Sequence, residues 1–378
     1  MLELRSVRGT GGGPDKTILL GARHPYRSPI AVTVCYIRDR RDDVFAIDRQ
    51  AARLGIDYEE IHERHSFDWT VWPALRAVVK RRGIHIVHAH DYKTDLAAWA
   101  LARRGLAIPL STAHGWAGAS ARERFYYRVE KQLLAYFPRV IAVSSPIKAE
   151  LIRAGCRPDR IVLVPNAITH REFVRNPDHR EPARHEFGFG EHERVIGAVG
   201  RLESEKRFDL LLEAFARIHA RWPWSRLLIA GEGRCRMELE RIIDRLRLAD
   251  VCRLLGHRPD ISRLHHAFDL FVQSSEREGT PNAVLEAMAF ETPLVVTDAG
   301  GTRDIVAHGV HALVVPPLDV SALAHAIESA LADPEASRMR ASAARRHVET
   351  ELSFERRMDR VEAIYRELIT STAQRDVA

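Results

Sequence analysis

Two glutamates eight positions apart, Glu278 and Glu286, flank a segment that could receive an anion. Between them lie Gly279–Asn282 (Gly-Thr-Pro-Asn), which follow a short apolar run. The glycine permits a tight turn, and we expect Thr280 to cap a helix whose first residue is Pro281. The N-terminus of such a helix offers backbone N–H groups to a phosphate. Flanking carboxylates suit a phosphorylated sugar, whose hydroxyl groups can donate to them, although a plain turn with two solvated glutamates would give the same pattern.

Three cations, Arg201, Lys206 and Arg207, form a second cluster between an apolar strand and an amphipathic helix. Positive side chains at a helix N-terminus are unfavourable unless an anion joins them. Glu203 and Glu205 could neutralise the cluster from within the chain. The alternative is a diphosphate group held by the same cations.

A third candidate is the run Gly11, Gly12 and Gly13 after the first strand, with Lys16 shortly beyond it. Glycines between a strand and a helix let a bound group approach the backbone. These four residues are therefore candidates for binding a substrate, although a flexible loop has the same composition. The run matches neither the dinucleotide-binding fingerprint nor a P-loop.

Histidines lie at the ends of two expected strands, with His88 and His90 at one and His114 at the next. A metal site needs three clustered ligands and an open position, which these spacings do not indicate. The commoner arrangement is a histidine held by hydrogen bonds at a strand end. We therefore expect no metal site.

Strand and helix patterns alternate along the chain, which predicts an α/β fold with doubly wound parallel sheets. One series ends at Pro165, and a second begins at Val195 after the polar tract Arg171–Glu181. We therefore expect one domain over residues 1–165 and another over 166–353. Ligands of such sheets bind outside the carboxyl ends of the strands, where the candidate residues lie.

The composition is that of a globular protein, with 378 residues of which 46% are apolar and 29% charged. No apolar run approaches the ~20 residues of a membrane span, and the N-terminus lacks the apolar core of a signal peptide. The four cysteines are scattered without a C-x-x-C pair, which indicates neither zinc nor disulfides. We expect a cytoplasmic protein.

The charge is uneven, since residues 1–165 hold 27 lysines and arginines against 17 acidic residues. Dispersed charges without interleaved aromatic motifs argue against nucleic acid, so an anionic membrane surface or a phosphorylated acceptor is the better partner. The expected helix Ala121–Tyr136 favours a membrane partner, because it separates an apolar face from a basic stripe. The apolar face consists of Phe125, Val129, Leu133 and Tyr136, and the basic stripe consists of Arg124, Arg128 and Lys131. The alternative is that the apolar face packs on the sheet.

The run Glu278-Gly279-Thr280-Pro281-Asn282 with Glu286 resembles the E-x7-E signature of retaining GT-B glycosyltransferases, especially of glycosyltransferase family 4 (GT4). The resemblance implies that Glu278 lies by the transferred sugar and that Glu286 holds the nucleotide ribose. Gly200-Arg201-Leu202 with Lys206 is similar to the family's phosphate-binding segment, whose two cations neutralise the leaving diphosphate in place of a metal ion. Thr112-Ala113-His114-Gly115 resembles a segment whose histidine reaches the donor sugar.

The resemblance implies a GT-B fold, in which two Rossmann-like domains face each other across a cleft and a last helix, here residues 354–378, returns to the first domain. It implies a retaining, metal-independent hexosyltransferase that needs no cofactor, with a nucleoside-diphosphate sugar in the C-terminal domain. The acceptor, a glycan or a lipid-linked glycan of cell-envelope or exopolysaccharide synthesis, would bind the N-terminal domain. From the basic charge of residues 1–165 and the helix Ala121–Tyr136, rather than from the resemblance, we expect the enzyme at the inner face of the cell membrane. With no nucleophile evident, front-side attack is the natural mechanism. A nucleotide-sugar epimerase and a non-catalytic nucleotide-sugar-binding protein are the alternatives.

Overall fold

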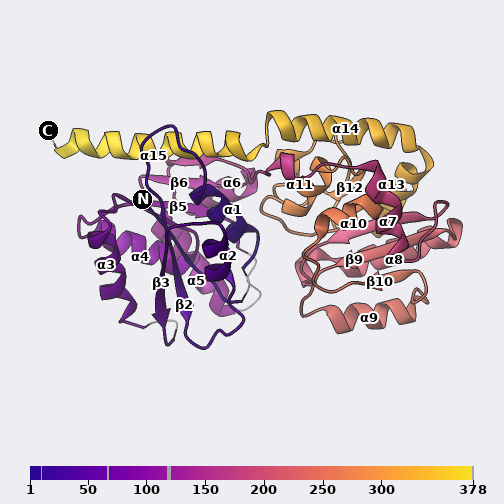
Figure 1. The fold of residues 1–378 in the computed structure, drawn as a ribbon, viewed down its shortest axis with the longest axis horizontal. Coiled ribbons are helices and arrows are strands. Elements are labelled where there is room, and N and C mark those ends of the chain that lie inside the picture. The colour runs from indigo at the N-terminus through magenta and orange to yellow at the C-terminus, as the bar shows by residue number, and fades with distance from the viewer. Residues whose placement is uncertain (10, 66–67, 117–120, 377–378) are drawn as a thin grey trace. The chain divides into compact units, whose positions relative to one another are not determined.

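The fold is described from a computed structural model, which covers residues 1–378 apart from 10, 66–67, 117–120 and 377–378. The chain forms two compact units. The first unit comprises Met1–Pro165 together with Glu355–Ala378, and the second comprises Asn166–Phe354. Figure 1 shows a sheet with helices on both of its faces in each unit.

The first unit contains a seven-stranded parallel sheet in the order β3-β2-β1-β4-β5-β6-β7. Its strands are β1 (Leu2–Ser6), β2 (Thr33–Asp39), β3 (Tyr58–Glu63), β4 (Ile86–Ala89), β5 (Ile108–Ala113), β6 (Arg139–Ala142) and β7 (Ile161–Leu163). Its helices are α1 (Gly13–Ala22), α2 (Ile47–Arg53), α3 (Val71–Arg81), α4 (Tyr92–Ala102), α5 (Ala121–Leu134), α6 (Ser145–Arg153) and, from the end of the chain, α15 (Phe354–Asp376).

The second unit repeats this arrangement with six parallel strands in the order β10-β9-β8-β11-β12-β13. The strands are β8 (Arg194–Val199), β9 (Ser225–Ala230), β10 (Cys252–Leu254), β11 (Leu270–Gln273), β12 (Leu294–Thr297) and β13 (Leu313–Val315). The helices are α7 (Arg180–His185), α8 (Phe208–Arg221), α9 (Arg236–Arg245), α10 (Ile261–Ala267), α11 (Asn282–Ala289), α12 (Thr302–Ile305), α13 (Val320–Ala332) and α14 (Pro334–Thr350).

Both faces of the second sheet are buried, which explains why its strands are continuously apolar rather than alternating. In β9, Leu227 and Ile229 belong to one core cluster. Leu228 and Ala230 of the same strand belong to another. Successive side chains of a strand point to opposite faces, so helices must cover the sheet on both sides.

In each sheet the strand order reverses at one place, between β1 and β4 in the first unit and between β8 and β11 in the second. Loops that leave neighbouring strands in opposite directions open a crevice at such a point, and ligands of doubly wound sheets bind there. The fold therefore directs attention to the segments that follow these four strands.

The helix α15 is anchored on the first unit by the carboxylate of Glu362. Its two oxygens accept hydrogen bonds from the backbone N–H groups of Arg27 (3.0 Å) and Ser28 (2.8 Å). Farther along the helix, the hydroxyl of Tyr365 donates to Glu3 in β1 at 2.9 Å. The end of the chain thus completes the unit with which the chain begins.

Candidate functional site

The reversal point of the second unit brings two of the candidate segments together. Arg201 follows β8, and Glu278 follows the neighbouring strand β11. The contact between the segments is direct, because the backbone N–H of Glu276 donates to the carbonyl of Glu205 at 2.8 Å. The cation cluster and the segment that carries Glu278 therefore belong to one site, with Glu286 farther along on α11.

Lys206 and Glu278 form an ion pair at the centre of this site, with Nζ 2.7 Å from Oε1. The lysine side chain is 20% exposed and the glutamate side chain 10%. The same carboxylate oxygen also accepts from the hydroxyl of Ser275 at 2.6 Å and from the amide of Gln273 at 3.4 Å. Three donors thus hold Glu278 in one orientation.

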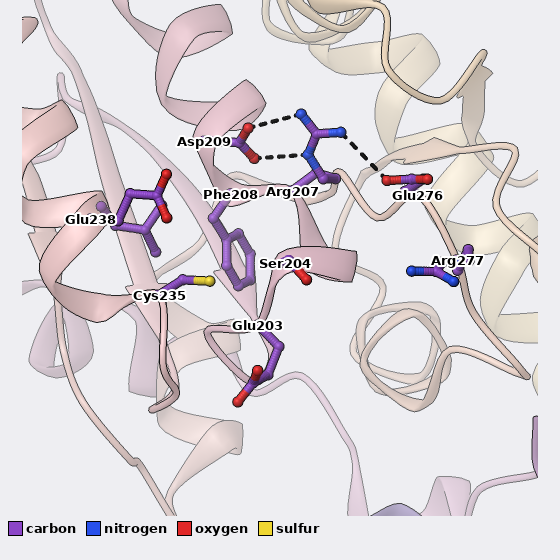
Figure 2. A pocket seen from close by; sticks show the side chains of 10 residues that line it. Glu203, Ser204, Arg207, Phe208, Asp209, Cys235, Glu238, Glu276 and Arg277 are labelled. Atoms are coloured by element: carbon purple, nitrogen blue, oxygen red, sulfur yellow. Dashed lines mark hydrogen bonds and ion pairs between the residues drawn. The ribbon is translucent and has the colours of Figure 1, made fainter. Parts of the chain in front are cut away.

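The other two cations of the cluster differ from Lys206. Arg201 is 68% exposed and pairs with Glu205 at 3.0 Å, so neutralisation from within the chain accounts for part of the cluster. Arg207 adopts a left-handed backbone (φ 51°) just before α8 and contacts Asp209 and Glu276, as Figure 2 shows. Arg207 therefore stabilises this loop through ion pairs rather than binding a ligand.

A hollow beside this loop, drawn in Figure 2, does not suit a diphosphate. Its lining holds four carboxylates against two guanidinium groups, namely Glu203, Asp209, Glu238 and Glu276 against Arg207 and Arg277. None of the predicted donor-binding residues lines it. The candidate site is the Lys206–Glu278 region instead.

The helix beyond Glu278 begins one residue later than expected. Pro281 is the residue before α11, with an extended backbone (φ −75°, ψ 101°), so it is not the first helical residue and Thr280 is not the cap. The hydroxyl of Thr280 instead accepts from the backbone N–H of Asn166 at 3.2 Å, while the Asn166 amide donates to Asn282 at 3.2 Å. The Thr280 side chain, which local sequence preference would assign to capping the helix, is thus engaged in a tertiary hydrogen bond instead.

The glycine run of the first unit is organised by Asp15, a residue that the sequence pattern alone does not single out. One oxygen of its carboxylate accepts from the backbone N–H of Gly12 at 2.7 Å, and the other accepts from the hydroxyl of Tyr36 at 2.7 Å. Gly11 has φ +80°, and a Cβ there would lie 2.5 Å from Cδ1 of Ile47. Gly11 therefore has a packing role.

The remaining candidates of this run are exposed or half-buried. A Cβ on Gly12 would meet nothing within 4 Å, and Gly12 and Lys16 are exposed at the start of α1, with Gly13 half-buried beside them. Their part in binding an acceptor stays a prediction.

The three histidines converge at the carboxyl ends of β4 and β5. Nδ1 of His90 lies 3.1 Å from Nε2 of His114, and Nε2 of His90 lies 2.5 Å from the carboxylate of Glu3. His88 contacts Thr112 through Nε2 (2.7 Å) and Tyr365 through Nδ1 (2.9 Å). Each histidine is thus held by hydrogen bonds, the commoner of the arrangements considered for strand ends.

The comparisons with known proteins agree with this geometry. The family model described as Glycosyltransferase Family 4 matches residues 12–172, and the model described as Glycosyl transferases group 1 matches residues 179–347. EpsD of Bacillus subtilis, which bears the name of a glycosyltransferase, is 32% identical over 280 residues, covering 71% of this chain and 73% of EpsD.

The chain is a family 4 glycosyltransferase. A D-inositol 3-phosphate glycosyltransferase from Geodermatophilus obscurus is also 32% identical, and this chain spans 66% of its length. Among solved structures, Anabaena HepE in complex with UDP-glucose superimposes with a TM-score of 0.84 at 22% identity, covering 97% of this chain and 100% of HepE. The expected GT-B fold and the expected enzyme family are both confirmed.

Two glycines support the candidate site of this glycosyltransferase from neighbouring loops. A Cβ on Gly231 (φ +148°) would lie 1.8 Å from the carbonyl oxygen of Gly200, directly before Arg201. A Cβ on Gly300 (φ +54°) would lie 1.9 Å from the carbonyl oxygen of Glu278. Gly231 directly follows β9, and Gly300 lies just beyond β12. A glycine at the end of a strand is the sequence signal that could have identified both residues.

One group of described residues in this glycosyltransferase offers ligand atoms close enough for a metal ion, namely Glu3, His88 and His90, whose atoms lie within 4.8 Å of one another. All four ring nitrogens of the two histidines already contact side chains. A metal ion would have to displace those hydrogen bonds, so the group does not fit a resident metal.

In the described part of the chain, no helix combines the length and the apolar character needed to cross a bilayer.

Proposed function

We propose that this family 4 glycosyltransferase moves a hexosyl unit, with retention of configuration, from a nucleoside-diphosphate sugar to a glycan or lipid-linked acceptor. The observation that carries the proposal is the Lys206–Glu278 pair, which places a cation and a fixed carboxylate just before the N-terminus of α11. A cation and a helix N-terminus suit phosphates, whereas a carboxylate suits sugar hydroxyls.

In the proposed mechanism the second unit holds the donor. Lys206 and Arg201 stabilise the charge that develops on the diphosphate as the bond from the anomeric carbon to the phosphate oxygen breaks. In the segment Gly279–Asn282, the residues Gly279, Thr280 and Asn282 bring backbone N–H groups to the same phosphates, whereas Pro281 has no N–H. Glu278 orients the transferred sugar, and Glu286 on α11 binds the ribose.

The acceptor is proposed to bind the first unit at Gly11–Gly13 and Lys16. Its hydroxyl oxygen attacks the anomeric carbon from the face that the diphosphate leaves, and its proton passes to the departing phosphate oxygen. No side-chain nucleophile takes part. HepE, which shares the fold, forms a complex with UDP-glucose, and uridine diphosphate sugars are therefore the first donors to try.

A donor screen tests this function. Released nucleoside diphosphate is measured for several nucleotide sugars with and without acceptor glycans or glycolipids, and each reaction is repeated with EDTA. We expect acceptor-dependent release and product with the anomeric configuration of the donor, at the same rate in EDTA, because side-chain cations neutralise the leaving group.

Each other outcome of the screen selects a rival. A new epimer of the sugar from donor alone would indicate an epimerase. Donor binding without turnover of any acceptor would indicate a binding protein. Loss of transfer in EDTA that Mn²⁺ restores would show that the proposed metal independence is wrong.

The first unit presents an apolar stripe to solvent on and just beyond α5. The side chains of Phe125, Val129 and Tyr136 are 61%, 45% and 73% exposed, so the alternative in which this face packs on the sheet is wrong for these three. Leu133 does pack against the core, and Lys131 pairs with Glu150. The exposed remainder of the basic stripe consists of Arg124 and Arg128.

We therefore propose peripheral attachment of α5 to an anionic membrane. Replacement of Arg124 and Arg128 together by glutamate should abolish co-sedimentation with anionic vesicles. The wild type should bind anionic but not neutral vesicles, and salt should weaken this binding by screening exposed charges.

The matched control replaces Arg217 and Arg221, which lie on α8 of the second unit, by glutamate. This control changes the net charge equally and should bind vesicles like the wild type. Equal recovery of the wild type from both vesicle types at low salt would contradict the proposal and favour a soluble acceptor.

A further inference from the structure

A chain of hydrogen bonds leads from Glu3 in β1 through His90 to His114. Glu3 and His90 are buried, whereas His114 is half-buried at the end of β5. The contacts are 2.5 Å from Glu3 to Nε2 of His90 and 3.1 Å from Nδ1 of His90 to Nε2 of His114. Each hydrogen bond of this chain has one donor and one acceptor. Once the charge of Glu3 is known, the nitrogen that carries the proton can therefore be assigned in His90 and then in His114.

Glu3 begins the chain as a charged acceptor. Burial opposes its ionised form, but His88 and His90 hold the pKa of Glu3 well below its usual range. A carboxylate can only accept hydrogen bonds, so Nε2 of His90 carries a proton. Burial lowers the pKa of His90 to about 4, and the neutral ring therefore has a lone pair on Nδ1.

The lone pair on His90 sets the state of His114. Burial lowers the pKa of His114 well below its usual range, and the charges of Arg5 and Arg357 act in the same direction. His114 is therefore neutral, and its one N–H must lie on Nε2 to donate to His90. Nδ1 of His114 is left as a bare acceptor, and that atom is buried with no hydrogen-bond partner among the described residues.

We infer that Glu3 and His90 are positioning residues that fix His114 as the Nε2–H tautomer, so that its Nδ1 accepts a hydrogen bond from a substrate hydroxyl. An atom with only a lone pair binds an O–H group and repels phosphate and carboxylate oxygens. The inference rests on the proposed function for the identity of that hydroxyl, since the family resemblance already leads us to expect that His114 reaches the donor sugar. What it adds is the tautomer of His114 and the two residues that fix it.

The second oxygen of Glu3 keeps the carboxylate in place. The hydroxyl of Tyr365 donates to it at 2.9 Å, and Nδ1 of His88 lies 3.2 Å away. Removing the Tyr365 hydroxyl disturbs the same carboxylate without touching the link to His90. Tyr365→Phe is therefore a control for damage to the network in general.

The tautomers are measured by two-bond ¹H–¹⁵N spectra of the protein labelled with ¹⁵N-histidine. The chain has 19 histidines, so signals are assigned through their loss in His90→Gln and His114→Gln. We expect both rings to be neutral with bare Nδ1 atoms in the wild type and in Tyr365→Phe. In Glu3→Leu, which removes the acceptor, we expect both tautomers of each ring.

Detection of a proton on Nδ1 of either ring in the wild type would overturn the inference, whether or not any donor is turned over. If Glu3→Leu does not fold, the spectra of the wild type still decide. Failure of the donor screen alone would count against the proposed function and leave the tautomers as inferred.

Deoxy analogues of the donor that is turned over give a functional readout. In the wild type, one deoxy position should lower kcat by roughly fivefold or more, the effect of one hydrogen bond. That penalty should vanish in His114→Ala and shrink in Glu3→Leu, but stay in Tyr365→Phe. A penalty that is equal in all four proteins at every deoxy position would show that His114 accepts no sugar hydroxyl.

Discussion

Replacement of Lys206 by alanine should lower kcat/KM for the donor by roughly 10- to 150-fold, which corresponds to about 1.5–3 kcal/mol for a hydrogen bond to a charged group. Lys206 is mostly buried, and its Nζ lies 2.7 Å from the carboxylate of Glu278. The variant loses one of the three donors that orient Glu278 and, under the proposed function, a contact to the diphosphate as well. Initial rates at varied donor concentration measure the effect.

The control for this substitution is Arg221→Ala. Arg221 is also a cation of the second unit, but its side chain is 74% exposed and pairs with Glu328, so its loss should leave the rates unchanged. Arg201→Ala should reduce turnover too, but less than Lys206→Ala, since the more exposed Arg201 is screened by water. A wild-type kcat/KM for the donor in Lys206→Ala would exclude Lys206 from the donor site.

The second large effect is expected from one methyl group added at Gly300. Gly300→Ala should weaken donor binding at least tenfold and destabilise the second unit by about 1–3 kcal/mol. The new Cβ would lie 1.9 Å from the carbonyl oxygen of Glu278. A backbone atom cannot rotate away as a side chain can, so the loop that carries Glu278 must move. Calorimetric titration with the nucleoside diphosphate and unfolding in denaturant measure the two effects.

Gly309→Ala separates the clash from the strain of the backbone. Gly309 has φ +75°, so alanine there carries a similar left-handed penalty of about 1–2 kcal/mol. A Cβ at Gly309 would meet nothing within 4 Å. We expect this variant to lose stability but to bind the nucleotide normally. Equal affinities in the two variants would show that the Gly300 contact does not hold the site.

The sequence was sufficient for the features that depend on local pattern. Alternating strand and helix patterns predict the two doubly wound sheets, and a cation cluster directly after β8 belongs at the carboxyl edge of a strand. The pairing of Lys206 with Glu278 could not be read in the same way, because 72 positions separate the two residues. Only the order of the strands, with β8 next to β11, makes them neighbours.

Glu3 shows why the rest of the network could not be predicted. In the sequence Leu2-Glu3-Leu4 it looks like the solvent-facing residue of an alternating strand. However, β1 is a central strand of a parallel sheet, so both of its faces are covered. The carboxylate is therefore buried and must find partners, which it does in His88 and His90. Burial on both faces is a property of the whole sheet and cannot be read from one strand.

The return of α15 to the first unit bears on how such an enzyme could be recombined with its relatives. The chain crosses between the units twice, near Pro165 and near Phe354, so the second unit is an insertion within the first. A chimera joined only at Pro165 would take its last helix from the other parent and mismatch the contacts of Glu362 and Tyr365. Exchange of Asn166–Phe354 as one cassette, with both junctions, keeps those contacts within a single parent. Donor specificity should therefore be transferable as an internal segment rather than as a C-terminal half.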